Sequence, residues 1–95
     1  MSAQPAVLRS VRVVFDVSDA MYSIADLKPS KGWIDVLMED IKDLGLFEEV
    51  SLDGHINHAA LVMPEYDAGH VQECQDALNG VLQMFYTKQL KKRKP

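Results

Sequence analysis

The stretch LFEEVSLDGHINHAALVM, residues 46–63, decides the fold of this chain. It contains two runs rich in apolar residues, 46–52 and 56–63, and Asp53 and Gly54 lie between them. An Asp-Gly pair in this setting is a strong hairpin signal, because a tight hairpin turn needs positive φ angles that glycine and aspartate tolerate. Residues 46–63 are therefore predicted to form a β-hairpin.

A further strand is expected upstream, in the run VLRSVRVVFDV at residues 7–17. Its apolar residues recur at every second position, the period of a half-buried strand, at Val11, Val13, Phe15 and Val17. Residues 18–32 follow without a clear period, and Pro29 and Gly32 interrupt them. This segment is long for a structureless loop in a compact domain, so we expect it to hold a helical turn or to be a functional loop.

Two amphipathic helices complete the pattern. The first is expected between a cap at Ser30 and a stop at Gly45. Its apolar residues repeat at intervals of three and four, at Ile34, Leu37, Met38, Ile41 and Leu44. The second is expected to begin after a cap at Asp67 and follows the same spacing at Val71, Cys74, Leu78, Val81, Leu82 and Phe85.

Gly80 leaves two interpretations of the C-terminal region. A glycine inside a helix costs roughly 1 kcal/mol relative to alanine. In the favoured interpretation the helix runs through Gly80 to about Leu90, and the glycine permits close packing on the sheet. In the alternative the helix ends at residues 79–80, and a fourth strand follows. The apolar phase continues unbroken across Gly80, which favours the long helix.

These elements predict one α+β domain over residues 1–95, with residues 1–6 and 91–95 expected to be flexible. The predicted order is β-α-β-β-α, a small antiparallel sheet with two helices packed on one face. The alternative with a fourth strand is β-α-β-β-α-β, the ferredoxin-like pattern. An apolar second helix that ends near Phe85, Tyr86 and Leu90 is compatible with a homodimer.

The charge of the chain is divided between its body and its C-terminus. Residues 88–94 hold five of the ten bases, while all fourteen acids and only five bases lie in residues 1–87, which therefore carry a net charge of −9. Seven acids against one base fall within residues 35–53. A concentrated negative surface attracts basic partners and repels nucleic acid.

The leading functional hypothesis is a small acidic, non-enzymatic protein-binding module, such as an inhibitor or adaptor. Its partner would be a basic protein surface, for example that of a nucleic-acid-binding protein. Trp33 is the expected apolar anchor, because an aromatic side chain beside a polar rim is typical of a binding hot spot. The expected charged contacts are Asp35, Glu39, Asp40, Asp43, Glu48, Glu49 and Asp53.

A second hypothesis gives the function to the basic C-terminus. Here the chain would be an RNA- or ribosome-associated factor that binds phosphates through Lys88, Lys91, Lys92, Arg93 and Lys94. Five charges neutralise few phosphates, so such binding would be weak and sensitive to salt. The negative charge of residues 1–87 would also repel the phosphates. A third hypothesis is a structural subunit of a larger assembly.

No motif predicts catalysis, a metal or a cofactor. His70 and Cys74 are four residues apart on the second predicted helix, but two ligands do not make a zinc site. Cys74 as a nucleophile would need a base and an electropositive, partly exposed setting, whereas its place on the apolar stripe predicts burial. One cysteine also excludes an internal disulfide.

The stretch VRVVFDVSDAM, residues 11–21, resembles the opening strand of a small early protein of some podophages that binds the host nucleoid protein H-NS. The shared features are an alternating strand and then Phe15, Asp16, Val17 and a hydroxyl residue, here Ser18. This resemblance implies a small viral protein that acts on a host target. We expect a cytoplasmic protein, in the host cytoplasm if viral, because no apolar run approaches the roughly 18 residues of a membrane span.

Overall fold

The computed structural model describes residues 10–93 and has an α+β fold. Its elements follow in the order β1 (Val11–Asp16), α1 (Ser18–Ala25), α2 (Trp33–Lys42), β2 (Glu49–Leu52), β3 (Asn57–Met63) and α3 (Ala68–Arg93). The predicted α+β class is confirmed. The predicted order is wrong in one respect, because the chain has three helices, arranged β-α-α-β-β-α, and not two.

The sheet is antiparallel, with strand order β1-β3-β2. The predicted hairpin is confirmed, since β2 pairs with β3 from Glu49 opposite Ala60 to Leu52 opposite Asn57. Its connection is a four-residue loop and not a tight two-residue turn. Only Gly54 of the Asp-Gly pair has positive φ, at 93°.

The helix α1 occupies most of the segment that was expected to be a loop with at most a helical turn. Val17, Met21 and Ile24 are buried at intervals of four and three, which is helical spacing. The carboxylate of Asp16 accepts a hydrogen bond from the Ser18 amide at 2.9 Å, which satisfies a free N–H group at the start of the helix. Burial of one face therefore makes this segment a helix.

A glycine precedes the helix α2 directly, and another follows shortly after its end at Lys42. The residue before Trp33 is Gly32, with φ 84°, so Ser30 is not the cap that the sequence predicted. Instead the Ser30 carbonyl accepts the Trp33 amide at 3.2 Å. The expected stop at Gly45 agrees with its φ of 69°, a conformation that glycine adopts without strain.

The helix α3 runs through Gly80, so the favoured long helix is confirmed and the alternative fourth strand is wrong. Its predicted cap is also present, because the Asp67 carboxylate accepts the His70 amide at 3.2 Å. Gly80 does not pack on the sheet as expected. It is exposed, and a methyl group there would meet nothing within 4 Å. Residues 91–93, expected to be flexible, continue α3. The other residues expected to be flexible, 1–6 and 94–95, lie outside the described residues.

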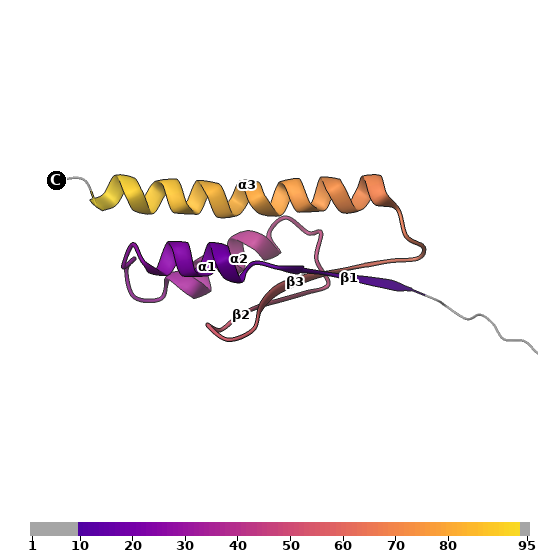
Figure 1. The fold of residues 1–95 in the computed structure, drawn as a ribbon, viewed down its shortest axis with the longest axis horizontal. Helices are drawn as coiled ribbons and strands as arrows, with labels where there is room; N and C mark the ends of the chain where they lie inside the picture. The colour runs from indigo at the N-terminus through magenta and orange to yellow at the C-terminus, as the bar shows by residue number, and fades with distance from the viewer. Residues whose placement is uncertain (1–9, 94–95) are drawn as a thin grey trace, which may run out of the picture.

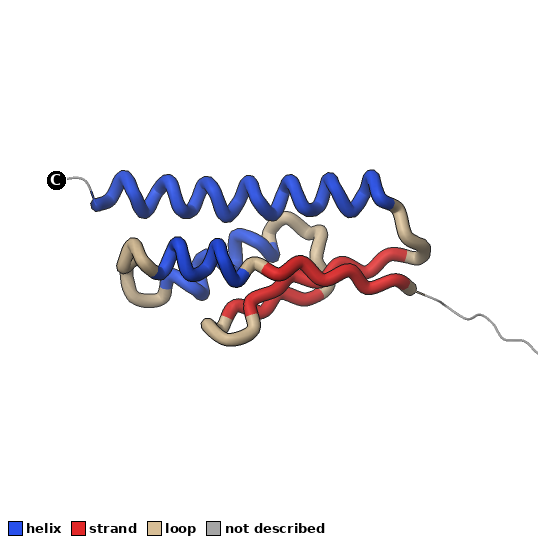
Figure 2. The backbone as a smooth tube through the Cα atoms, in the orientation of Figure 1, coloured by secondary structure: helices blue, strands red, loops and turns tan. Residues whose placement is uncertain are grey.

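The helices are arranged around α3, the longest element. Figures 1 and 2 show α3 running along one side of the molecule, with α1 and α2 beneath its C-terminal half and the sheet beneath its N-terminal half. A single core joins the sheet to all three helices, through residues such as Phe15, Ile24, Leu37, Leu61 and Leu78. None of the helices within residues 10–93 is both long enough and apolar enough to cross a membrane.

Candidate functional site

A groove lies between α2 and α3 on the outer surface of the molecule. It consists of two adjoining hollows of about 190 and 240 Å³ that share Asp40, Phe85 and Lys88. Trp33 forms part of its lining, and its ring lies 6.3 Å from the ring of Phe85, tilted by 37°. Val36 is 56% exposed beside it. The groove therefore offers apolar and aromatic surface between two rows of charged residues.

Four of the predicted acidic residues lie on α2: Asp35, Glu39, Asp40 and Asp43, the last at its C-terminal cap. All four are exposed. Among residues 10–93 none of their carboxylates has a hydrogen-bond or ion-pair partner. At 100° per residue they form one arc on the solvent side of the helix. Asp40 and Asp43 border the groove, and the other two lie further round. We call this arc the α2 acidic face.

The remaining predicted acids lie apart from the α2 acidic face. Glu49 is on β2 and pairs with Arg12 of β1, on the sheet face opposite the helices. The carboxylate of Asp53 accepts the amides of His55 and Ile56 at 2.8 and 2.7 Å, so it holds the hairpin loop together. These two residues have structural partners, whereas Glu48 is exposed before β2. The predicted acidic surface is therefore not continuous from helix to hairpin.

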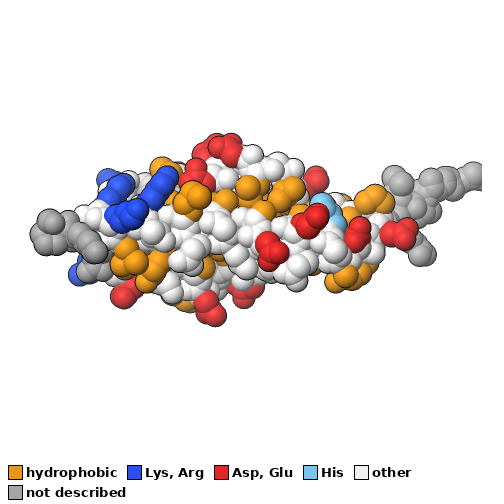
Figure 3. Space-filling model, turned by 90° about the horizontal axis from the view of Figure 1, so that it is seen from above, with side chains coloured by type: hydrophobic (Ala, Val, Ile, Leu, Met, Phe, Trp, Pro, Cys, Tyr) orange, Lys and Arg blue, Asp and Glu red, His pale blue; other side chains and the backbone are white. Residues whose placement is uncertain are grey.

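The predicted basic site lies at the end of the groove away from Asp43. Lys88 and Lys92 belong to α3, and together with Lys31 they line its basic end beside Asp40. Lys91 is also exposed on α3. Figure 3 shows that lysine side chains gather near the C-terminus on this side of the molecule, whereas acidic side chains are spread over the rest. The structure thus places residues of the two rival hypotheses in a single groove, which the sequence did not suggest.

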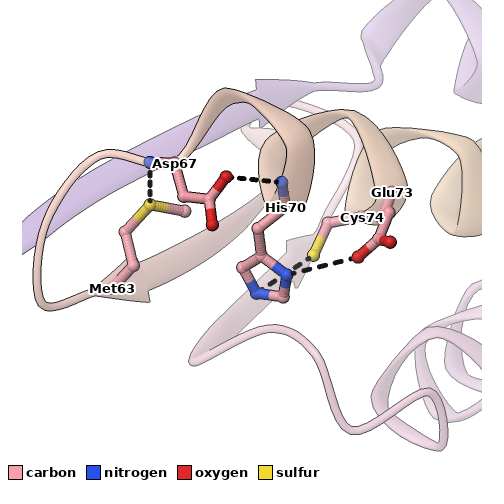
Figure 4. Close-up of polar contacts among 5 residues, drawn as sticks. All are labelled: Met63, Asp67, His70, Glu73 and Cys74. Carbon is pink, nitrogen blue, oxygen red and sulfur yellow. Dashed lines mark hydrogen bonds and ion pairs between the residues drawn. The ribbon is translucent and has the colours of Figure 1, made fainter.

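A Cys-His-Glu cluster lies at the start of α3 (Figure 4). The Cys74 Sγ is 3.8 Å from the His70 Nε2, and the His70 Nδ1 is 3.7 Å from the Glu73 carboxylate. Cys74, His70 and Glu73 are thus in the order of a nucleophile, a base and an acid that orients the base, but Cys74 is fully buried. Burial, and secondarily the charge of Glu73, raises the pKa of the Cys74 thiol, which disfavours the reactive thiolate. The cluster is better explained as packing at the first turns of α3.

No other arrangement of chemically active groups stands out in residues 10–93. A cavity of about 440 Å³ between α1 and α3 is lined by one ionisable residue of the described part of the chain, Tyr86. His55 lies exposed in the hairpin loop, while His58 is on β3, 4.0 Å from Glu49. Within the part of the chain that is described, no three potential metal ligands converge.

The groove itself was missed by sequence reasoning, although Trp33, Asp40 and Asp43 were each nominated. Helical spacing places Asp40 and Val36 at the edge of the apolar stripe of α2, but it does not show which helix packs beside that edge. The pairing of α2 with α3 depends on the long α3 helix folding back along the molecule. The chain matches no protein-family model, no curated protein sequence and no solved structure.

Proposed function

We propose that this chain is a non-enzymatic protein-binding module, an inhibitor or adaptor that receives a basic segment of another protein along the α2 acidic face and the adjoining groove. The observation that carries the proposal is the set of four exposed carboxylates that have no hydrogen-bond or ion-pair partner among residues 10–93, next to an aromatic groove. Like charges one turn apart on a helix destabilise it by a few tenths of a kcal/mol each. A basic partner would relieve that repulsion.

The groove suggests how such a partner would bind. A basic amphipathic helix would direct its apolar residues to Trp33 and Val36, and its Lys and Arg residues to Asp40 and Asp43. Apolar anchors surrounded by charged residues are the usual arrangement of a binding hot spot. The charges would mainly speed association and select the partner, and the apolar contacts would supply most of the affinity.

The RNA-binding alternative has support in the convergence of Lys31, Lys88 and Lys92 at one end of the groove. Three ammonium groups there would suit a phosphate. However, Asp40 lines the same hollow, and phosphates would also meet the negative potential of the α2 acidic face. We therefore rank the basic protein partner first.

Trp33 provides a direct test, because it is the only tryptophan of the chain and lines the groove. The probe is a synthetic Lys-rich amphipathic helix with a leucine stripe, titrated while Trp33 fluorescence is recorded. We expect saturable binding that weakens with salt. The triple variant Glu39→Gln, Asp40→Asn, Asp43→Asn should bind about tenfold more weakly, since each exposed charge pair contributes up to roughly 1 kcal/mol.

The matched control is Asp26→Asn, Glu65→Gln, Asp76→Asn, which removes the same charge from exposed sites elsewhere. It should bind nearly as well as the wild type. Equal loss in the two triple variants would mean that only net charge matters, and no saturable binding would exclude the groove as a basic-peptide site. A single-stranded RNA that binds instead, and is released by Lys88→Gln and Lys92→Gln, would transfer the function to the basic end.

A further inference from the structure

The solvent side of α3 carries a regular stripe of residues on the side of the helix opposite the core. Their spacing alternates between four and three, which keeps them on one side of a helix and is the spacing of a coiled-coil seam. We call this the outer stripe: Glu73, Ala77, Gly80, Met84, Thr87 and Lys91. Ala77 is half-buried and the other five are exposed, whereas the core residues Cys74, Leu78, Leu82 and Phe85 lie on the opposite side.

The centre of the outer stripe is apolar and has an uneven surface. Met84 is 63% exposed, an unusual position for a long apolar side chain. One turn earlier, Gly80 leaves a gap on the helix surface, and a methyl group there would meet nothing within 4 Å. Met84 borders one hollow of the groove, but most of its side chain is exposed, and nothing in the described chain fills the gap at Gly80. If a second copy of the helix runs in the opposite direction, the Met84 side chain of each copy can fill the gap at Gly80 of the other.

The charges of the stripe favour the same arrangement. In α3 the acids Glu73 and Asp76 lie in the first half, and all the bases lie at or after Lys88. Figure 3 looks onto this side of the molecule, with basic side chains near the C-terminal end and acidic ones spread over the rest. A parallel pair of helices would place like charges opposite each other. An antiparallel pair places Glu73 opposite a lysine at each end.

We infer that the chain forms a homodimer in which the outer stripes of two α3 helices pack antiparallel about a two-fold axis near residue 82. In this register Gly80 of one copy receives the partner's Met84, Ala77 faces the partner's Thr87, and Glu73 faces the partner's Lys91. Each of the six positions thus has a partner, and each contact occurs twice, as two-fold symmetry requires. This dimer does not depend on the proposed function: the outer stripe shares only Met84 with the lining of the groove, and the residues changed in its test, Glu73 and Lys91, lie outside that lining.

Charge reversal tests the register. Sedimentation equilibrium at low ionic strength should show a monomer–dimer equilibrium for the wild type. Glu73→Lys and Lys91→Glu should each weaken it about tenfold, since each turns two attractive pairs into repulsive ones. The double variant Glu73→Lys, Lys91→Glu restores opposite charges across the axis, so it should recover the wild-type dissociation constant to within about threefold.

Two controls separate the register from general effects. Glu65→Lys makes the same charge change at an exposed site before α3 and should leave dimerisation unchanged. Helix content measured by circular dichroism should be equal in all variants. The inference is overturned if the wild type stays monomeric at every concentration, or if the double variant dimerises no better than the single ones.

A zero-length carbodiimide cross-linker gives a second readout. It joins a carboxylate to an ammonium group only when the two are in contact. Within one helix Glu73 and Lys91 are about 27 Å apart, at 1.5 Å per residue, so a 73–91 cross-link must join two copies. Mass spectrometry of the dimer band should find this link, and a dimer without it would exclude the antiparallel register.

Discussion

At the residue scale, the acidic side chains of this chain divide into those with a structural task and those without one. The Asp53 carboxylate accepts two backbone amides in the hairpin loop, and the Asp16 carboxylate accepts the Ser18 amide at the start of α1. Both positions lie where backbone N–H groups would otherwise lack a partner. The α2 acidic face makes no such contacts within residues 10–93, which is why we assign it to a partner.

Asp53 is expected to make stability depend on pH in the acid range. The amides of Ile56 and then His55 hold the pKa of the Asp53 carboxyl below its ordinary value. A group with a lowered folded-state pKa stabilises the protein above its unfolded pKa, near 3.9, and this contribution is lost as the pH falls through the folded value. Asp53→Asn keeps an oxygen acceptor but has no charge to titrate, so it should lose less stability than the wild type on acidification.

Urea unfolding at pH 7, 5 and 3.5 measures this difference. Glu65→Gln is the control, because Glu65 is exposed and has no hydrogen bond among the described residues. Its free energy of unfolding should change with pH in the same way as that of the wild type. If Asp53→Asn and the wild type lose the same stability between pH 5 and 3.5, the two amide hydrogen bonds do not hold the carboxylate as described.

At the element scale, the sequence predicted the elements that have strong local signals. The hairpin has Asp-Gly between apolar runs, and α3 has an apolar phase that continues across Gly80, so both were predicted correctly. The helix α1 was missed because it spans only eight residues, Ser18–Ala25. Its buried positions Val17, Met21 and Ile24 do have helical spacing, but the first of them also fits the preceding strand.

The glycines show why local signals must be combined with tertiary structure. Gly80 and Gly45 both leave open space where a methyl group would lie, but only Gly45 has positive φ, at 69°. Gly80→Ala should therefore stabilise the monomer by about 1 kcal/mol, the helix-propensity difference between the two residues. Gly45→Ala should destabilise the protein by roughly 1–2 kcal/mol, because alanine is strained in the left-handed region.

Urea unfolding at a low protein concentration, where the chain is monomeric, measures both changes. Opposite signs for the two variants are the expected result. A destabilising Gly80→Ala would indicate that the α3 backbone at this position is not an ordinary helix. At high concentration the same variant should dimerise less, since its methyl group fills the gap that receives the partner's Met84.

At the scale of the whole molecule, the two candidate surfaces could not be derived from the sequence because both depend on how α3 is placed. Its inner side closes the core, its side toward α2 forms the groove, and its solvent side carries the outer stripe. Sequence periodicity identifies the inner side alone. The roles of the side toward α2 and of the solvent side can be inferred only once it is known which elements lie beside them.

The homodimer predicts a thermal stability that depends on protein concentration. A partner that binds only the folded chain stabilises it by mass action. Once most of the protein is dimeric, each tenfold rise in concentration contributes about 1.4 kcal/mol per dimer, which corresponds to a few degrees in Tm for a domain of this size. Scanning calorimetry over a hundredfold concentration range should show this rise for the wild type and for the double variant Glu73→Lys, Lys91→Glu. The single variant Glu73→Lys, with its tenfold higher dissociation constant, should need about tenfold more protein to reach the same Tm. A constant Tm for the wild type would contradict dimerisation through α3.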